Sequence, residues 1–323
     1  MRRDIISEVT TRLMLLDTAS LYFRAYFGIP DSVRAPDGTP VNAVRGLLDF
    51  IARLVTTYEP SDLVCCWDDD WRPAWRVDLI PSYKLHRVVA PIPSGVDIEE
   101  TPDPLETQIP VIRAALAALG IAVIGAQDHE ADDVIGTLAT QAGVPVDIVT
   151  GDRDLFQLVS DERAVRVLYT ARGVGKLEVV TDEVVVRKYG VLPEQYVDFA
   201  VMRGDPSDGL PGVKGVGDKT AAALLQRYGD LDGIRGAALD PTSSLAGGVR
   251  GKLLEASDYL DVAPTVVRVV GDLSLPKTAT RIALPNAAVL TTFEEFAASW
   301  GLGSSATRAV AALRGRSAGD LDG

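Results

Sequence analysis

Acidic side chains gather in three short clusters of this 323-residue chain, and their spacing points to chemistry on a bound cation. The clusters are HEADD (129–133), TGDRD (150–154) and GDPSDG (204–209), and Asp17 and Asp68 each end an apolar run. Carboxylates held a few ångströms apart either raise their pKa values or bind hard cations. Without thiolate or imidazole partners the ligands are all oxygen, which favours Mg²⁺ or Mn²⁺ over zinc. Two such ions about 4 Å apart suit phosphodiester hydrolysis, because one activates water and the other stabilises the departing oxygen.

Each acidic motif also has a simpler structural explanation. A lone strand-end aspartate such as Asp17 or Asp68 is more often a helix N-cap than a metal ligand. The acidic turn Glu130–Asp133 is typical of a solvated helix start, where the helix dipole favours negative charge. The conjunction of five acidic segments favours the metal site, because a parallel sheet gathers its strand ends at one crevice.

Apolar runs alternate with helical patterns up to about residue 203, which predicts an α/β fold with a mostly parallel central sheet flanked by helices. The apolar spacing predicts helices that cover the sheet over 41–58 and 130–141. The expected strands are 12–17, 62–68, 121–126 and 146–152. Three of these strands end in aspartate, so we expect their carboxylates to converge at one edge of the sheet.

Three further segments depart from this pattern. Residues 1–13 precede the expected start of the first strand at Met14 and are predicted to be an extension. Pro81 to Pro104 contains five prolines and no sustained period, which predicts a long mobile excursion from the core. Residues 204–323 are predicted to form a helical subdomain with a helix over 305–313 and a frayed tail.

Composition restricts the class of protein. Hydrophobic residues make up 47% of the chain, enough for a large core, and the formal net charge is −13. The longest uncharged apolar stretch, Ala114 to Gln127, is shorter than the ~20 residues of a membrane span, so we expect no membrane association. Cys65 and Cys66 lie in an apolar run and are predicted to be buried, and no secretory signal is evident, so we expect a cytoplasmic protein. The acidity predicts repulsion from nucleic acid unless local basic surface or bound cations offset it.

Basic residues concentrate in two segments. Between Trp71 and Ser94 four cations and one acid give a local charge of 4 − 1 = +3, from Arg72, Arg76, Lys84, Arg87 and Asp78. The segment GVKGVG (212–217), followed by DKTAAALLQRYG, predicts a helix-hairpin-helix type element. Its small residues let backbone amides approach phosphates and its lysines add charge, at Gly212, Lys214, Gly215, Gly217 and Lys219. Such contacts position duplex DNA without reading sequence, and binding through them should weaken with salt.

Together these motifs resemble the bacterial 5′ nuclease family, which comprises flap endonuclease and 5′–3′ exonuclease modules at the front of DNA polymerase I and stand-alone proteins. The resemblance covers about Met14 to Val270. It rests on LLDTASLYFRAYF, a strand that ends WD before WR and SYKLHR, HEADDVIGTLA, IVTGDRDLFQLVS and GDPSDGLPGVKGVGDKTAAALL. It implies a PIN-like α/β nuclease core over 14–203 with an arch at about 81–104, followed by a helix-three-turn-helix element in 204–323. We expect the free-standing type.

The resemblance also implies roles for individual residues. Lys84 and Arg87 would lie at the base of a helical arch, orient the scissile phosphate and offset charge in the transition state. Arg24, at the flap junction, and Arg76 are predicted DNA contacts, and the helix-hairpin-helix element is expected to bind K⁺ through backbone carbonyls. The implied metal ligands are Asp17, Asp68, Glu130, Asp132, Asp133, Asp152, Asp154, Asp205 and Asp208.

Two positions depart from the family pattern. The family has a single aspartate after the second strand, whereas this chain has three; alignment from Trp67 selects Asp68, alignment back from Arg76 selects Asp69, and we favour Asp68. An asparagine commonly follows the last acidic motif where this chain has Gly209. We expect this change to loosen the hydrogen bonding around Asp208.

The implied function is a structure-specific 5′ nuclease that uses two or three Mg²⁺ or Mn²⁺ ions on branched, flapped or nicked duplex DNA, with 5′ RNA among its candidate substrates. It would be a monomer that removes primers and trims flaps, and it would join the nucleoid during replication and repair. A PIN-like ribonuclease would explain the acidic crevice but not GVKGVG. A non-catalytic branched-DNA binder would require a broken ligand set.

Overall fold

A six-stranded sheet forms the centre of the protein, in a computed structural model that describes residues 11–92, 95–283 and 286–319. Its strands run in the order β5-β2-β1-β6-β7-β8, and only the β7–β8 pair is antiparallel. The mostly parallel sheet is therefore confirmed. Each predicted strand matches an observed one to within two residues. The strands are β1 (Leu13–Asp17), β2 (Asp62–Cys66), β5 (Ala122–Ile124), β6 (Val146–Thr150), β7 (Val165–Tyr169) and β8 (Glu178–Val180).

The strand order reverses beside β1. From β1 the chain builds β2 and β5 on one side, and it then crosses to build β6 and β7 on the other. Leu16 of β1 is in register with Cys65 of β2 and Val149 of β6, so the three strands end level with one another. A reversal of this kind leaves a crevice outside the carboxyl ends of the strands, where Asp17 is the last residue of β1.

Each face of the sheet has its own apolar core, because successive strand residues point to opposite sides. Leu13 and Leu15 pack on one side with α6 (Ala131–Gln141), α8 (Tyr196–Arg203) and α12 (Ser257–Val267). Met14 and Leu16 pack on the other side with α1 (Thr18–Gly28), α2 (Asn42–Tyr58) and α5 (Ile109–Ala118). The predicted helices over 41–58 and 130–141 are thus α2 and α6. Cys65 and Cys66 are buried free thiols, as expected.

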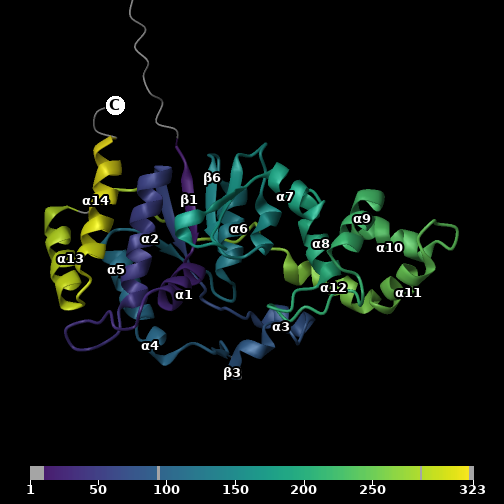
Figure 1. The fold of residues 1–323 in the computed structure, drawn as a ribbon, viewed down its shortest axis with the longest axis horizontal. Coiled ribbons are helices and arrows are strands. Elements are labelled where there is room, and N and C mark those ends of the chain that lie inside the picture. Colours follow the sequence, from purple (N-terminus) through teal and green to yellow (C-terminus); the bar gives the residue numbers. More distant parts are fainter. Residues whose placement is uncertain (1–10, 93–94, 284–285, 320–323) are drawn as a thin grey trace, which may run out of the picture.

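The described residues of 81–104 form short pieces of structure rather than a helical arch. After α3 (Ala74–Leu79) come a 3₁₀ turn (Leu85–Arg87), the antiparallel pair β3 (Val88–Ala90) and β4 (Ile98–Glu99), and α4 (Asp103–Glu106). Figure 1 shows this hairpin beyond the edge of the core. The expectation of a helical arch is wrong for these residues, because prolines repeatedly remove the amides that a helix needs. Passage of a DNA strand beside the hairpin stays a prediction.

A helical lobe extends from the other end of the sheet. The chain leaves β8 through α7 (Asp182–Tyr189), a 3₁₀ turn (Pro193–Gln195) and α8, and then forms α9 (Asp218–Tyr228), α10 (Leu231–Leu239) and α11 (Gly247–Glu255). Figure 1 shows α9, α10 and α11 projecting from the core and α12 returning towards it. The helix expected to begin near Asp218 is α9, so the prediction of this one helix is confirmed.

The predicted helical unit 204–323 is divided in the structure. Helices α13 (Ala287–Ser299) and α14 (Gly303–Gly319) pack on α5 and α2, on the opposite side of the molecule from α9–α11 (Figure 1). Ser305 Oγ donates to Asp49 at 3.0 Å and Arg308 Nε at 2.9 Å. The frayed tail and the single unit are corrected for these residues, because α14 has an apolar stripe whose partner, α2, lies far away in sequence.

Some predictions concern residues outside this description. Residues 1–10 of the predicted extension and 320–323 of the predicted tail lie outside the described residues. β1 begins at Leu13, inside the predicted strand 12–17, so the last residue of the predicted extension 1–13 already belongs to the sheet. No helix among the described residues is long and apolar enough to cross a membrane.

Packing of α14 on the core predicts a measurable loss of stability when its apolar stripe is shortened. Leu313 is 2% exposed, so Leu313→Ala should lower the free energy of unfolding by about 2–4 kcal/mol through lost burial and the cavity left behind. Leu239 is 73% exposed, and Leu239→Ala should change it by no more than about 0.5 kcal/mol. Urea unfolding measures both values. Equal stability of the two variants would contradict the packing of α14.

Candidate active site

A cleft of about 420 Å³ opens at the carboxyl edge of the sheet, at the strand reversal. Three basic side chains line this cleft: Lys84, Arg87 and Arg153. The structure thus brings most of the predicted ligands together from separate segments of the chain. Six of the nine predicted metal ligands line the cleft: Asp17, Asp68, Glu130, Asp132, Asp152 and Asp205.

Asp17 serves both the helix and the cleft. Its Oδ1 accepts from the Ser20 amide at 3.2 Å and caps α1, while Oδ2 accepts from Thr150 Oγ1 at 2.7 Å. Burial raises the pKa of Asp17 to about 7, and the charges of Asp68 and Asp152 contribute to the rise. The N-cap explanation and a place in the candidate metal site are therefore compatible.

Asp68, rather than Asp69, faces the cleft. Asp68 Oδ1 accepts from the Ala131 amide at 2.8 Å, which ties the end of β2 to the start of α6, and burial raises its pKa to about 6. Asp69 instead accepts from Arg113 Nη2 at 3.2 Å, and its side chain is 38% exposed. The position of Asp68 supports its choice as the candidate ligand.

Asp154 has a buried oxygen without a donor. Its side chain follows β6, and within the described residues Oδ1 has no hydrogen-bond partner. Burial raises the pKa values of Asp154 and Asp132 well above the ordinary range, and the nearby charge of Asp152 raises both further. A buried carboxylate oxygen without a donor destabilises the fold unless a proton or a cation satisfies it. The carboxylate oxygens of these residues, and the repulsion between their charges, therefore fit a hard divalent cation as ligand.

These carboxylates do not form a closed metal cage. Across the described ranges, no three His, Cys, Asp or Glu side chains are grouped closely enough to hold an ion by themselves. Mg²⁺ commonly binds through one or two carboxylates and keeps several waters, so it does not require such a cage. The arrangement suits an open site that shares its ions with a substrate.

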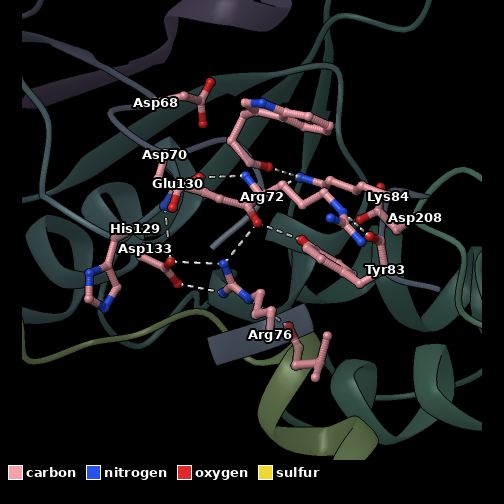
Figure 2. A network of polar contacts seen from close by, with 12 residues as sticks. Asp68, Asp70, Arg72, Arg76, Tyr83, Lys84, His129, Glu130, Asp133 and Asp208 are labelled. Atoms are coloured by element: carbon pink, nitrogen blue, oxygen red, sulfur yellow. Dashed lines mark hydrogen bonds and ion pairs between the residues drawn. The ribbon is translucent and has the colours of Figure 1, made fainter. Parts of the chain in front are cut away.

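Glu130 is the centre of a polar network in the cleft wall (Figure 2). It accepts from Tyr83 Oη at 2.7 Å and from Arg76 Nη1 at 3.1 Å, and its second oxygen forms an ion pair with Lys84 Nζ. Although burial opposes ionisation, the charges of Lys84 and Arg76 hold the pKa of Glu130 below its ordinary value. Glu130 is therefore ionised and already neutralised by cations.

Arg76 and Asp133 face the interior, so the structure corrects both predictions. Arg76 donates to Asp133 at 2.9 and 2.7 Å through its two Nη atoms and to the Val266 carbonyl at 3.0 Å through Nε. Arg76 is 2% exposed and Asp133 is fully buried. Asp133 also accepts from the Val270 amide at 2.9 Å. Because these partners satisfy both groups, Arg76 is not placed to contact DNA and Asp133 is not placed to bind a metal.

The GDPSDG loop forms the opposite wall. Asp205 Oδ1 accepts from the Ser207 amide at 2.9 Å, and Asp205 Oδ2 lies 3.3 Å from Arg203 Nη2. Asp208 Oδ1 accepts from Arg87 Nη2 at 2.9 Å, and burial raises the pKa of Asp208 to about 6. Arg87 therefore meets the predicted metal ligand Asp208. The action of Lys84 and Arg87 on a phosphate stays a prediction.

The predicted DNA-binding turn has the backbone shape that its glycines allow. Gly212 and Gly215 have φ values of +65° and +70°, and a Cβ on Gly212 would lie 2.5 Å from the Gly204 nitrogen. Lys214, Gly217 and Lys219 are exposed around the start of α9. Lys252 of α11 donates to the Gly215 carbonyl at 3.3 Å, a contact that sequence reasoning missed because the two residues are 37 positions apart.

Arg24 lies beside the cleft. Its Nη2 would be 3.6 Å from a Cβ on Gly151, and Gly151 lines the cleft. Its Nε is buried, and no partner for it is found among the described residues. This placement is compatible with the predicted DNA contact.

Sequence reasoning also missed neutral groups that hold the site. Thr150 bonds Asp17, Tyr83 bonds Glu130, and Ser207 bonds Asp205. Each lies inside or next to a quoted motif. The two-residue spacing of Asp205 and Ser207 is a local turn pattern that could have suggested their bond. No spacing rule pairs Thr150 with Asp17 or Tyr83 with Glu130, because these residues lie 133 and 47 positions apart.

Substitution of the buried Arg76 should lower the stability of the fold and leave the affinity for DNA unchanged. Arg76→Gln leaves Asp133 and Glu130 without their shared partner, so we expect the free energy of unfolding to fall by about 3–5 kcal/mol. Arg113→Gln removes the half-exposed pair with Asp69 and should cost no more than about 1 kcal/mol. Denaturant unfolding measures both, and duplex affinity per folded molecule should match the wild type. A large loss of affinity without loss of stability would restore Arg76 as a DNA contact.

The raised pKa values predict that the metal-free protein loses stability as pH rises. The folded-state pKa values of Asp17, Asp68 and Asp208 are about 7, 6 and 6, above the value of about 3.9 in unfolded chains. Between these values the folded state binds more protons, so the free energy of unfolding decreases with pH.

Thermal unfolding in EDTA should therefore give a lower Tm at pH 8 than at pH 6, and excess Mn²⁺ should raise Tm more at pH 8. Asp17→Asn removes one of these titrating groups and should reduce the slope. A slope unchanged by both Asp17→Asn and Mn²⁺ would contradict this explanation.

Solved structures share this fold at low sequence identity. The bacteriophage T5 D15 protein co-crystallised with metal ions superposes with a TM-score of 0.63 at 15% identity, over 95% of this chain and 99% of that one. The catalytic core of Rad2 in complex with DNA substrate gives 0.58 at 18% identity, over 94% and 92%. These likenesses confirm the expected fold.

Curated relatives are much more similar in sequence. A 5′-3′ exonuclease of Streptomyces coelicolor is 60% identical over 304 residues, which cover 93% of this chain and 99% of that protein. A 5′-3′ exonuclease of Mycobacterium tuberculosis is 53% identical, over 80% and 84%. DNA polymerase I of the same species is 42% identical over 75% of this chain but only 26% of the polymerase.

Two family models match consecutive parts of the chain. Residues 12–190 match the N-terminal resolvase-like domain of 5′-3′ exonucleases, and residues 191–288 match their C-terminal SAM fold. These matches cover most of the chain and meet where β8 and α7 give way to the helical lobe. The chain therefore belongs to the 5′-3′ exonuclease family, as its motifs predict.

Proposed function

We propose that this protein hydrolyses phosphodiesters of branched, flapped or nicked duplex DNA near the junction of single and double strands, with Mg²⁺ or Mn²⁺ as cofactor. The carrying observation is the cleft itself. Buried carboxylates that repel one another, including Asp17 and Asp132, line it together with Lys84 and Arg87.

The residues that would hold the ions are the carboxylates at the cleft whose oxygens remain available. Asp17, Asp68, Asp132, Asp152 and Asp154 would bind them, with Asp205 and Asp208 on the opposite wall. Asp133 is not included, because Arg76 occupies both of its oxygens. Glu130, also a predicted ligand, is left out because Arg76, Tyr83 and Lys84 engage its two oxygens. When bound, the ions would supply Lewis acidity and an activated water.

Lys84 and Arg87 would orient the scissile phosphate. Both are engaged by carboxylates in the free protein, Lys84 by Glu130 and Arg87 by Asp208. A phosphate oxygen could replace the carboxylate that each cation now contacts, while Glu130 would keep its hydrogen bonds from Arg76 and Tyr83. They would then offset the negative charge that develops during cleavage.

Duplex DNA would bind beyond the cleft at the Gly212–Gly217 turn. Its exposed Lys214 and Lys219 and the amino end of α9 can contact backbone phosphates, and Arg24 would contact the junction. The K⁺ expected at this turn would bind backbone carbonyls other than that of Gly215, which accepts from Lys252. DNA is present in solved complexes of the T5 flap endonuclease and Rad2, which supports this part of the proposal.

The remaining parts of the proposal concern context. We infer a monomeric cytoplasmic enzyme that accepts 5′ RNA during primer removal and associates with the nucleoid in replication and repair. Removal of a primer and trimming of a repair flap require the same incision at a junction, so one site serves both.

Incision of a labelled 5′-flap substrate in Mn²⁺ tests the function. Asp152→Asn should slow incision by on the order of a hundredfold or more, similar to the loss of one group that stabilises a transition state. Asp161 is exposed in the turn before β7, at the opposite edge of the sheet, and Asp161→Asn should cut at the wild-type rate. Failure of the wild type to cut, or full activity of Asp152→Asn, would refute the proposal. Faster cleavage of single-stranded RNA than of the flap would favour a ribonuclease.

A further inference from the structure

The segment that carries Lys84 and Arg87 is attached by hydrogen bonds to the loop that carries Asp205 and Asp208. Ser82 Oγ donates to the Gly209 carbonyl at 2.7 Å, and the Lys84 amide donates to the Asp208 carbonyl at 2.9 Å. Arg87 Nη2 also donates to the Ser207 carbonyl at 2.8 Å. These contacts join residues more than 100 positions apart, and each of the three ends on a backbone carbonyl of the loop.

The attachment depends on the absence of a side chain at residue 209. Gly209 has a φ of +70°, a conformation that residues with a Cβ rarely adopt. A Cβ at this position would lie 2.0 Å from the Ser82 carbonyl oxygen and 2.9 Å from the Ser82 carbonyl carbon. Both atoms belong to the backbone, so the clash could be relieved only if the two segments separated.

The same contacts hold Lys84 in an unusual conformation. Lys84 has a φ of +47°, in the left-handed region that disfavours a residue with a Cβ. The hydrogen bond from the Lys84 amide to the Asp208 carbonyl supports this conformation, and the Lys84 ammonium pairs with Glu130 inside the cleft. The neighbouring Tyr83 hydroxyl bonds the same carboxylate (Figure 2). The two predicted phosphate contacts are thus in position in the free protein.

We propose that Gly209 is a positioning residue, which keeps the 82–87 segment against the Asp205–Gly209 loop and so places Lys84 and Arg87 at the cleft before DNA binds. This inference rests on the proposed roles of Lys84 and Arg87. It reverses the expectation that a glycine at 209 loosens the bonding around Asp208. The close backbone approach that glycine permits is what brings two donors, the Lys84 amide and the Arg87 guanidinium, to that residue.

Steady-state cleavage of the flap substrate gives the first test. Gly209→Ala should separate the segments and lower kcat by about 10- to 100-fold, since displacement of a catalytic group by about 1 Å can cost this much. KM should change less than about threefold, because the duplex-binding turn is untouched. Ser82→Ala removes one hydrogen bond without a clash and should lower kcat only a few fold.

A matched glycine separates the clash from the cost of a positive φ. Gly38 has a φ of +92°, and a Cβ there would meet no atom within 4 Å. Gly38→Ala should therefore bear the backbone penalty and keep the wild-type kcat. In the background of Lys84→Met with Arg87→Met, the further change Gly209→Ala should cause no additional loss, because Gly209 acts through these two cations. Additive losses would indicate general damage to the fold and overturn the proposal.

Hydrogen exchange tests the attachment without activity. The Lys84 amide should be protected in the wild type and in Gly38→Ala, and it should exchange at least tenfold faster in Gly209→Ala. Unchanged exchange, or a Gly209→Ala variant within twofold of the wild-type kcat, would refute the role of Gly209. If the wild type cut no DNA, the proposed function would fail while the exchange result still decided whether Gly209 holds the segment.

Discussion

The buried guanidinium of Arg76 is the constraint on which the site depends. A cation removed from water requires nearly complete compensation, and Arg76 obtains it from Asp133, Glu130 and the Val266 carbonyl. These partners come from the start of α6 and the end of α12. One charge therefore joins α3, the acidic wall of the cleft and the helical lobe, so the sheet and the predicted duplex-binding turn are held in one arrangement.

The acidic residues consequently divide into two groups. Glu130, Asp133 and Asp208 have cationic partners within the protein. Asp17, Asp132 and Asp154 have raised pKa values because burial and neighbouring carboxylates oppose their ionisation. The second group would give a divalent ion much of its binding energy, since a bound ion would relieve repulsion that the fold maintains. The net charge of −13 is thus partly a property of the site, and local cations need not overcome all of it.

Much of the fold follows from local pattern. Apolar runs that end in aspartate identify β1, β2 and β6, and the apolar spacing of α2 and α6 is visible over several turns. The helix predicted over 305–313 is present within α14, but the structure of 81–104 and the packing of α14 were less accessible to this reasoning. The segment 81–104 is irregular because its prolines permit only short elements. Helix α14 packs on α2, and Ser305 and Asp49 in this contact lie 256 positions apart, so no local pattern could identify the partner.

The amino-acid sequence by itself determined which chemical groups this protein has: oxygen ligands suited to a hard metal ion, basic side chains near them, and a glycine turn suited to phosphate. It could do so because residue types and motif spacing are local properties. Only the tertiary structure decided how these groups are used. It turned Arg76 and Asp133 inward, selected Asp68 over Asp69 for the cleft and placed the Ser82 carbonyl against Gly209. The physical reason is that a side chain's role depends on which distant groups share its burial, and those groups are chosen by the packing of the whole chain.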